Sequence, residues 1–344
     1  MNVQHEVVLA SLTTLGLGGP ARRLARVVNV GELELVLGEA AAANERVLVL
    51  GGGSNVVVGD AGWDGVVIQL AMPEVRVRMH DDMAVVSAFA GAVWDDVVAQ
   101  MVDAKLVGIE CLSGIPGMAG ATPMQNVGAY GQEVAETIAF VRAYDRETKQ
   151  VVKLEPKDCH FAYRTSVFKG SERWIILEVR FVFRRGELSA PIRYPELSRA
   201  LDIADGESAP LGEVRDTVIA LRRGKGMVVD PKDPESRSAG SFFTNPIVDP
   251  ETFAALETRL PDLTIPHWSQ PDGSTKLSAA WLIERAGFSK GYTKGHVAIS
   301  RKHALALVTR DGATTVELLA LAHEIQDGVR GKLGIDLVME PVII

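Results

Sequence analysis

The chain has 344 residues, 47% of them hydrophobic and 23% charged, which suits two or three globular domains. Its net charge of −8 excludes the basic footprint of a protein that binds nucleic acid or an anionic membrane. The N-terminal segment lacks a basic start followed by an apolar run, and no stretch approaches the roughly 20 apolar residues of a membrane span. We therefore expect a cytoplasmic protein without nucleic-acid or membrane partners.

The two cysteines, Cys111 and Cys159, form no CxxC pair. This spacing predicts neither a metal site nor a disulfide framework. Buried, reduced thiols are the expected outcome.

The first half of the chain predicts a mixture of strands and helices. Residues 31–45 and 92–105 carry apolar side chains at helical spacing. Between them, a short strand ends at three glycines, a second strand follows, and residues 65–90 alternate as antiparallel strands do. Further strands are predicted at 138–144, 150–154 and 174–184, around a long glycine-rich loop at 107–131. Residues 1–185 therefore indicate an α+β region.

The composition changes near residue 186. Residues 186–210 are polar and interrupted by proline, which is typical of a connector or a surface insertion. Residues 240–330 then indicate a smaller α/β domain, with strand-like residues at 295–310. The chain ends in a predicted strand at 335–344. Helices are predicted at 211–223, at 277–287, and at 314–330 with Thr314 as cap and Glu317 at the capping-box position.

Gly51, Gly52 and Gly53, followed by Ser54 and Asn55, form the first candidate site. Consecutive glycines let backbone N–H groups converge on an anion, because no side chain blocks the approach and positive φ is accessible. The motif lacks the GK[ST] of a Walker loop, and a strand rather than a helix follows it. By itself it fits a plain tight turn as well as a phosphate-binding turn.

Residues 113–131 (SGIPGMAGATPMQNVGAYG) form a more specific candidate. Buried loop backbone needs hydrogen-bond partners, and a flat or pyrophosphate-bearing ligand can supply them. Gln125 and Asn126 carry amides that can pair with a heterocycle. A rigid crossover without a ligand is the alternative, although loops of this length tend to be functional.

The segment FAYRTSVFK (161–169) places Arg164 beside Tyr163, with Ser166 and Lys169 nearby. A partly desolvated guanidinium can bind a carboxylate at two points. The alternative is a surface arginine stacked on Tyr163 or Phe168.

Ser241 and Glu340 are candidates for proton chemistry. A serine beside apolar rings can protonate only a strongly basic acceptor such as a carbanion, and a turn or helix-cap role is the alternative. The surrounding sequence is not GxSxG, so it does not predict a hydrolase nucleophile. Glu340 lies in an apolar segment, where a buried carboxyl is paired or protonated, unless it faces solvent on an edge strand.

Taken together and in order, these segments resemble the UDP-N-acetylenolpyruvoylglucosamine reductase family. The chain is similar to the longer family type, which keeps an insertion around Tyr194. The matching segments are TLGLGG (14–19), LGGGSNVVV (50–58), IPGMAGATPMQNVGAYG (115–131), FAYRTSVFK (161–169), AGSFFTNP (239–246), DGSTKLSAAWLIERAG (272–287) and LVMEPV (337–342).

The resemblance implies an α+β fold, with a two-part FAD-binding unit of the vanillyl-alcohol-oxidase type and a smaller α/β domain for the UDP-sugar. The implied division is two FAD-binding subdomains at 1–70 and 71–220, a substrate domain at 221–330, and a C-terminal strand at 331–344 that returns to the active site. FAD is expected to bind noncovalently, and the protein is expected to be a monomer.

The resemblance also implies the reaction: NADPH-dependent reduction of UDP-N-acetylenolpyruvoylglucosamine to UDP-N-acetylmuramate, in peptidoglycan precursor synthesis. NADPH would give a hydride to FAD, and flavin N5 would pass it to the vinyl CH₂ carbon. Arg164 and Glu340 match the family residues that polarise the substrate carboxylate. Ser241 matches the proton donor to the neighbouring carbanion.

The same match implies the binding residues, and it implies no metal ligand. Those expected to hold FAD are Gly51, Gly52, Gly53, Ser54, Asn55, Gly117, Gly120, Ala121, Gln125, Asn126, Gly128, Tyr130 and Arg222. Those expected to contact the UDP-sugar or the NADPH phosphate are Tyr163, Tyr194, Lys225, Asn245, Lys276 and Lys290.

Two features depart from the family pattern. The family usually carries several residues beyond the final strand, whereas this sequence ends at Ile344, and His303 stands where relatives often have an amide. Two other functions stay open at this point: an FAD-dependent alcohol or sugar oxidase, and a non-catalytic flavin or nucleotide sensor. The AGSFF and MEP segments argue against the oxidase, and the presence of Arg164, Ser241 and Glu340 argues against the sensor.

Overall fold

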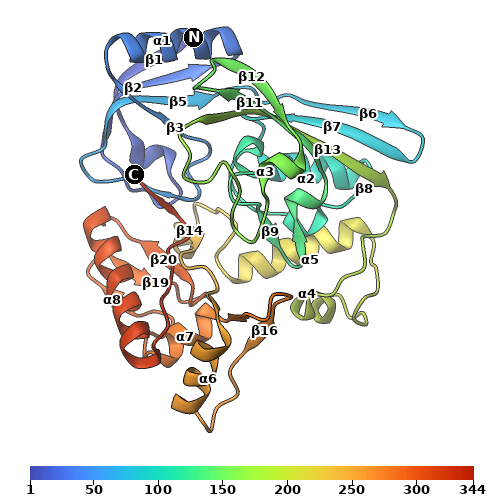
Figure 1. The fold of residues 1–344 in the computed structure, drawn as a ribbon, viewed down its shortest axis with the longest axis vertical. Coiled ribbons are helices and arrows are strands. Elements are labelled where there is room, and N and C mark those ends of the chain that lie inside the picture. The colour runs from blue at the N-terminus through green and yellow to red at the C-terminus, as the bar shows by residue number, and fades with distance from the viewer. The chain divides into compact units, whose positions relative to one another are not determined.

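The computed structural model describes residues 1–344, which divide into two compact units. The first unit consists of Met1–Val7, Ala21–Gly53 and Trp63–Val228, and the second of Val8–Pro20, Ser54–Gly62 and Val229–Ile344. Each unit is therefore assembled from three segments, and those of the second unit are far apart in the sequence (Figure 1). The four-part division expected from the sequence stays a prediction.

The first unit contains a four-stranded sheet in the order β1 (Asn2–Val8), β2 (Pro20–Val27), β5 (Trp63–Leu70) and β3 (Arg46–Val49). β5 runs parallel to both β2 and β3. The prediction of antiparallel strands throughout 65–90 is therefore wrong for β5. Alternation reports which face a residue occupies but not strand direction. Here β2 and β3 are joined by a helical crossover and run in the same direction, and β5 lies between them and runs parallel to both.

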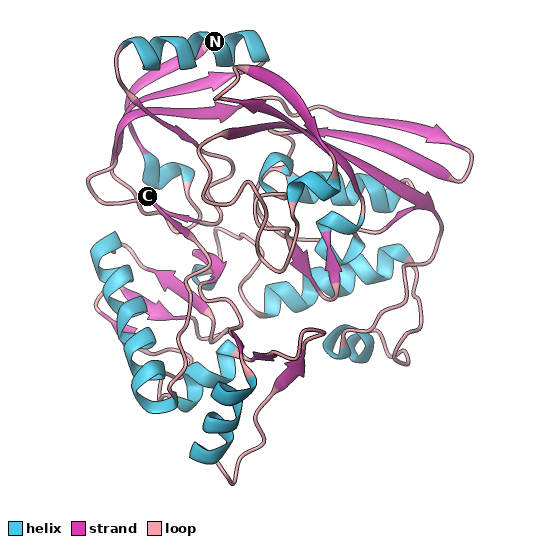
Figure 2. Ribbon diagram, viewed as in Figure 1, coloured by secondary structure: helices cyan, strands magenta, loops and turns pink.

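That crossover is α1 (Val30–Ala42), which lies along one face of the sheet (Figure 2). Leu33, Val36 and Ala40 form its buried stripe, at the helical spacing read from the sequence. Asn29 caps the helix by accepting a hydrogen bond from the Glu32 backbone N–H. The predicted helix at 31–45 is thus confirmed over most of its length.

The second sheet of this unit has the order β12 (Gln150–Leu154), β11 (Ile138–Asp145), β13 (Trp174–Arg185), β7 (Met83–Phe89) and β6 (Val75–His80), with β8 (Leu106–Val107) also paired to β13. All of these pairs are antiparallel. The strands predicted at 138–144, 150–154 and 174–184 are confirmed. Figure 1 shows β6 and β7 as a long hairpin at the edge of the sheet.

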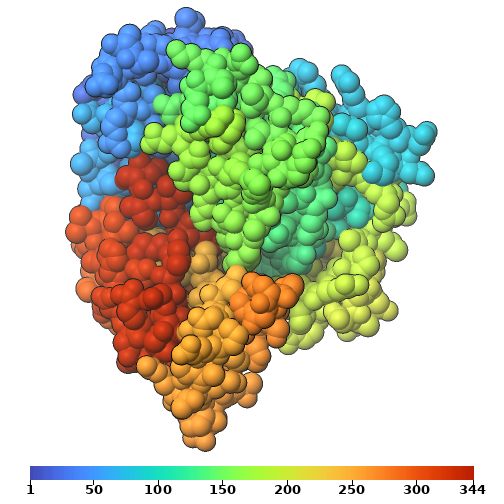
Figure 3. Space-filling view, in the orientation of Figure 1, coloured from blue at the N-terminus to red at the C-terminus, as the bar shows by residue number.

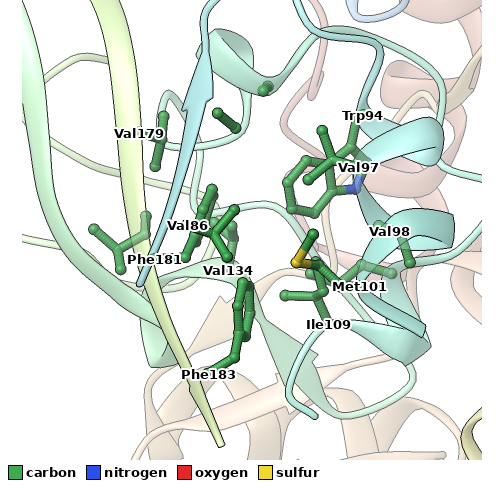
Figure 4. Close-up of a cluster of buried hydrophobic side chains, with 14 of the residues drawn as sticks. Val86, Trp94, Val97, Val98, Met101, Ile109, Val134, Val179, Phe181 and Phe183 are labelled. Carbon is green, nitrogen blue, oxygen red and sulfur yellow. The ribbon is translucent and has the colours of Figure 1, made fainter. Parts of the chain in front are cut away.

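One face of this sheet packs on α2 (Trp94–Asp103) to form the main core of the unit. Trp94 and Met101 point from the helix toward Phe181 and Phe183 of β13 (Figure 4). The Trp94 and Phe181 rings lie 6.0 Å apart between centroids. This packing fixes the start of α2, whose first backbone N–H donates to the Gly117 carbonyl of the glycine-rich loop.

Short elements and one longer helix, α5 (Leu211–Gly224), make up the rest of the first unit, and most of the short elements lie in the loops that carry candidate residues. The short elements are η2 (Glu110–Leu112), η3 (Ala119–Ala121), β9 (Gly128–Ala129), β10 (Gln132–Glu133), η4 (Val134–Glu136), α3 (Pro156–Cys159) and α4 (Pro195–Ala200). The helix predicted at 211–223 is confirmed as α5. The polar insertion at 186–210 contains one short helix, α4.

The second unit contains a four-stranded sheet, a three-stranded sheet and a pair of short strands. Their strands are β14 (Ser238–Ser241), β20 (Ala306–Thr309), β19 (Val297–Ile299) and β18 (Thr293–Lys294); β15 (Ile247–Val248), β17 (Thr275–Leu277) and β16 (His267–Ser269); and β4 (Val56–Val57) with β21 (Val342–Ile343). The other elements are η1 (Leu9–Leu12), η5 (Pro234–Ser236), α6 (Pro250–Arg259), α7 (Ala279–Arg285) and α8 (Thr315–Leu333).

The core of the second unit lies around α7 and α8. Leu282, Leu318 and Ile325 are fully buried there, together with Leu15 and Val57 from the N-terminal third of the chain. This shared core explains why residues 8–20 and 54–62 belong to the second unit. The predicted capping box of α8 is confirmed: the Thr314 side chain accepts from the Glu317 N–H, and the Glu317 side chain accepts from the Thr314 N–H.

The prediction of a terminal strand over 335–344 is wrong for most of that range. Only Val342 and Ile343 form a strand, parallel to β4, while Met339 makes an isolated antiparallel bridge to Phe243. The partner changes at Pro341, which has no N–H to continue a ladder. Val338, Val342 and Ile343 are exposed, and Figure 3 shows red C-terminal residues at the surface of the face it draws.

None of the helices is long and apolar enough to cross a membrane. No group of three or more His, Cys, Asp or Glu side chains is arranged to hold a metal ion. Cys111 and Cys159 are buried free thiols, and burial raises the pKa of both, that of Cys159 to about 12. Neither thiol is set up as a nucleophile.

Candidate active site

Two glycine-rich segments of the first unit pack directly against each other. A Cβ built on Gly52 would lie 2.8 Å from the Gly117 Cα, so only glycine fits at position 52 without a shift of backbone. A Cβ on Gly51 would lie 3.7 Å from the Ala121 Cβ, an ordinary contact. We call Gly51–Gly53 together with Gly117–Ala121 the glycine cradle.

Backbone hydrogen bonds fix the second half of the glycine cradle. The Ala119 N–H donates to the Ala92 carbonyl at 2.8 Å, and the Gly120 N–H donates to the Ala90 carbonyl at 3.1 Å. A Cβ on Gly120 would lie 2.6 Å from the Ala90 Cβ. The cradle is therefore a rigid surface of bare backbone, which suits a ligand that approaches the main chain closely.

Three predicted site residues other than glycine adopt left-handed backbone conformations: Asn126 (φ 46°), Tyr130 (φ 48°) and Arg164 (φ 54°). This region disfavours bulky L-residues and is enriched at functional sites. The Asn126 side chain is buried and forms hydrogen bonds within the protein: its Nδ2 donates to Glu133 Oε2 at 2.7 Å, and its Oδ1 accepts from the Ala135 N–H. A contact between Asn126 and a cofactor stays a prediction.

Arg164 turns back toward the glycine-rich loop. Its Nη2 donates to the Gly128 carbonyl at 2.8 Å, and its guanidinium lies 5.3 Å from the Tyr163 ring. The stacking on Tyr163 is the contact that the second interpretation expects, whereas binding of a carboxylate by Arg164 stays a prediction. Ser166 donates to the Met124 carbonyl and Lys169 to the Arg164 carbonyl, so both hold the segment in place.

A compact cluster forms around Tyr130 in the same unit. The rings of Tyr130 and Tyr194 meet edge to face at 5.3 Å, and burial raises the Tyr130 pKa to about 12. The Lys225 ammonium lies 5.3 Å from the Tyr130 ring and pairs with Glu196 at 2.5 Å. Tyr130, Tyr194 and Lys225 are candidates predicted from the sequence, whereas Glu196 is not among them.

Arg222 lies on the last turn of α5 and is 9% exposed. Its Nη2 donates to the Met227 carbonyl at 3.0 Å, whereas its Nε is buried without an acceptor in the protein. Burial lowers the pKa of this guanidinium to about 10. A buried cation with an unused donor is costly, so this group is arranged for an acceptor that the chain itself does not supply.

Ser241 and Glu340 both belong to the second unit and lie close together along its backbone. Ser241 ends β14, where the Phe242 N–H donates to the Leu305 carbonyl at 2.7 Å. The Glu340 N–H donates to the Phe242 carbonyl at 2.9 Å, and the Thr244 N–H to the Val338 carbonyl. The two candidate residues are thus brought together from positions almost 100 residues apart in the sequence.

The other candidates in the second unit occupy varied environments. Asn245 accepts a hydrogen bond from the Ala279 N–H at the start of α7, which gives its side chain a structural role. Lys276 lies in β17, 5.8 Å from the Trp268 ring, and Lys290 is exposed. The Asn55 carbonyl accepts from the Val342 N–H, and His303 is half-buried in the turn between β19 and β20.

The candidate residues are divided between the units. Those in the first unit are Gly51, Gly52, Gly53, Gly117, Gly120, Ala121, Gln125, Asn126, Gly128, Tyr130, Tyr163, Arg164, Tyr194, Arg222 and Lys225. Those in the second unit are Ser54, Asn55, Ser241, Asn245, Lys276, Lys290 and Glu340.

Comparisons with known proteins define the class of enzyme. A family model described as an FAD binding domain matches residues 21–154, and the C-terminal domain model of UDP-N-acetylenolpyruvoylglucosamine reductase matches residues 232–344. These matches, with the mixed helices and strands described above, confirm the predicted α+β fold with an FAD-binding part and a smaller α/β part. The protein is a flavin-dependent oxidoreductase.

Full-length relatives narrow this class to one family. The UDP-N-acetylenolpyruvoylglucosamine reductase of Thermobifida fusca is 52% identical, over 99% of this chain and 97% of its own length. That of Salinispora arenicola is 49% identical, over 98% and 95%. The crystal structure of the Thermus caldophilus reductase covers 100% of this chain and 99% of its own, with a TM-score of 0.67 at 26% identity. The chain belongs to the UDP-N-acetylenolpyruvoylglucosamine reductase family.

The first unit has features that fit FAD, the cofactor of this family. The glycine cradle is packed so closely that a Cβ at position 52 would meet the Gly117 backbone and a Cβ at position 120 would meet Ala90. The buried Arg222 Nε has no acceptor within the chain. A dinucleotide with anionic phosphates and ring carbonyls offers both a close fit to bare backbone and acceptors for a guanidinium.

Proposed function

We propose that this protein catalyses the NADPH-dependent reduction of UDP-N-acetylenolpyruvoylglucosamine to UDP-N-acetylmuramate, in peptidoglycan precursor synthesis. The full-length relatives named as this reductase support the proposal. The observation that carries it is the hydrogen bond from the Glu340 N–H to the Phe242 carbonyl, since it holds the proposed acid beside the segment of the proposed proton donor, Ser241.

The glycine cradle and Arg222 are the proposed core of the FAD site, in line with a noncovalent cofactor. FAD held there would supply the redox chemistry, which is hydride transfer between NADPH and the vinyl carbon of the substrate. The glycines let the cofactor lie against backbone N–H groups. Arg222 adds a charge-assisted donor in a desolvated place, where such a bond is strong.

Arg164, Glu340 and Ser241 are the proposed catalytic residues. The Arg164 guanidinium offers two parallel donors to the substrate carboxylate and offsets the charge that builds up on it. Glu340, in its protonated form, donates to the same carboxylate without repelling it. Ser241 donates its hydroxyl proton to the adjacent carbon, and the buried rings of Phe242 and Phe243 keep water from competing.

The remaining candidates bind the rest of the substrate in this proposal. Lys225 contacts the diphosphate as a point charge, and Tyr194 and Asn245 contact the diphosphate and the sugar. Tyr163, Lys276 and Lys290 provide further contacts to the substrate or to the NADPH phosphate. The division into FAD-binding segments at 1–70 and 71–220, a substrate domain at 221–330 and a returning C-terminal segment at 331–344 belongs to the same proposal.

Anaerobic stopped-flow absorbance at about 450 nm tests the proposal, because the flavin is its own reporter. NADPH should bleach the band, and UDP-N-acetylenolpyruvoylglucosamine should restore it. In Ser241→Ala the bleaching should keep its rate, while recovery should slow by about 10²- to 10⁴-fold, the usual contribution of a general acid. Ser241→Cys keeps an ionisable proton and should recover part of the lost rate.

Each failure has a distinct meaning. A flavin that NADPH bleaches but the substrate does not reoxidise would remove the substrate assignment and favour an oxidase. Equal slowing of both half-reactions in Ser241→Ala would remove the proton-donor role and leave a structural one. A purified protein that binds no FAD even on reconstitution would contradict the whole proposal.

A further inference from the structure

In the proposed function Lys225 binds the diphosphate of the substrate, and in the structure its ammonium is already paired with Glu196. Lys225 is the residue after α5, and its ammonium lies 2.5 Å from Glu196 Oε2. Glu196 is in the first turn of α4, two residues after Tyr194. The side chains of Lys225 and Glu196 are 26% and 34% exposed, so both remain accessible to a ligand in solution.

Glu196 reaches Lys225 from a different part of the chain. α4 belongs to the polar insertion at 186–210, and it is anchored by Leu197, which packs with Ile192, Val214 and Val218. Lys225, in contrast, follows the long helix α5, and its ammonium lies over the Tyr130 ring. The insertion therefore contributes the carboxylate of the ion pair, and the end of α5 contributes the ammonium.

A carboxylate and a diphosphate compete for the same ammonium. Both are hard anions that accept its N–H donors, and two anions held a few ångströms apart in a half-buried place repel each other. The bond to Glu196 must therefore be exchanged for a bond to phosphate when the diphosphate binds. The exchange favours ligands with enough negative charge to replace a carboxylate.

We propose that Glu196 is a specificity-determining residue, an internal anion that the diphosphate of the substrate must displace from Lys225. This inference rests on the proposed function, which makes Lys225 a diphosphate contact. Glu196 lowers the affinity for every ligand that uses Lys225, and it lowers it most for ligands whose charge at that point is weak. It also couples binding to the Tyr194 segment, because Glu196 and Tyr194 are separated only by Pro195.

Equilibrium binding to the FAD-loaded protein tests the inference. The probe is UDP-N-acetylglucosamine, which carries the diphosphate and the sugar but no enolpyruvyl group, and calorimetry gives its Kd. Glu196→Gln keeps the shape and removes the charge, so the Kd should fall by roughly 2- to 5-fold, the range expected when a partly exposed ion pair no longer has to be broken. Glu213→Gln removes one charge from the exposed surface of α5 and should leave the Kd unchanged.

A double-mutant cycle shows whether the effect runs through the lysine. Lys225→Gln should weaken binding, and adding Glu196→Gln to it should tighten binding clearly less than the same change does in the unaltered protein, because only the repulsion between the two anions is then relieved. A Kd that is unchanged or raised in Glu196→Gln would overturn the inference while the proposed function stands. Equal tightening with and without Lys225 would also overturn it, because a general charge effect would then explain the result.

Two outcomes test the proposed function on which the inference rests. If Lys225→Gln binds the probe as the unaltered protein does, Lys225 is not a diphosphate contact and the inference falls, although the substrate assignment survives. If the unaltered protein does not bind the UDP-sugar at all, the proposed substrate class falls and the inference falls with it.

Discussion

Replacing Gly52 by alanine tests the glycine cradle directly. The new Cβ would lie 2.8 Å from the Gly117 Cα and 3.3 Å from its carbonyl carbon, so it meets backbone rather than the flexible end of a side chain. Backbone cannot rotate out of the way as a side chain can, and overpacking of this kind costs about 1–3 kcal/mol. The two halves of the cradle must therefore separate by some tenths of an ångström.

This cost divides between the stability of the apoprotein and the affinity for FAD. If all of it is felt only in the complex, FAD binding weakens by about 5- to 150-fold, since 1.4 kcal/mol corresponds to a factor of ten. If the free protein already carries the strain, thermal unfolding of the apoprotein shifts down by about 1–2 °C per kcal/mol. The two losses together should reach the range of the overpacking cost.

Gly51→Ala is the matched control. Its Cβ would meet only the Ala121 Cβ at 3.7 Å, and neither glycine has the positive φ that would strain an alanine. Fluorescence titration of FAD into the apoprotein gives the affinity, and circular dichroism gives the unfolding temperature. If Gly52→Ala and Gly51→Ala match in both affinity and stability, the close approach of Gly52 to Gly117 does not shape the cofactor site.

Two further predictions concern stability. Asp145 accepts two hydrogen bonds from Arg173, which lower its pKa from 3.8 to about 2, so the stability from this pair is present above about pH 4 and is lost as pH falls toward 2. Asp145→Asn should therefore flatten acid unfolding over that window, whereas Asp64→Asn, in an exposed pair with Arg22, should follow the unaltered curve. Thr314→Ala removes the N-cap of α8 and should lower the free energy of unfolding in denaturant by about 1 kcal/mol. Thr314→Ser keeps a hydroxyl acceptor and should retain most of that stability. An alanine variant as stable as the unaltered protein would show that the cap does not stabilise α8.

The helices were predictable from the sequence because their causes are local. The apolar stripe of residues 92–105 and the Thr314–Glu317 pair act within a turn or two of the chain, and both appear in the structure. The strand direction of β5 was not predictable, because alternation is the same in parallel and antiparallel pairs.

Long-range assembly accounts for the other differences. Residues 8–20 and 54–62 join the second unit because Leu15, Leu17 and Val57 complete its core, and no local pattern marks that choice. The terminal segment changes partner at Pro341, which a continuous apolar run does not reveal. Glu196 was missed for the same reason, because its partner Lys225 is 29 residues away in the sequence.

The loops that carry the candidate site could be found from composition, but their strain could not. Tyr163 and Arg164 form the tip of a tight turn, closed by two hydrogen bonds of 3.2 Å between Ala162 and Thr165. Glycine or asparagine suits the positive φ of such a turn, whereas arginine disfavours it. The arginine at position 164 is therefore not explained by the turn. It fits instead the use that the turn makes of the guanidinium, which donates to the Gly128 carbonyl of the glycine-rich loop and is the proposed partner of the substrate carboxylate.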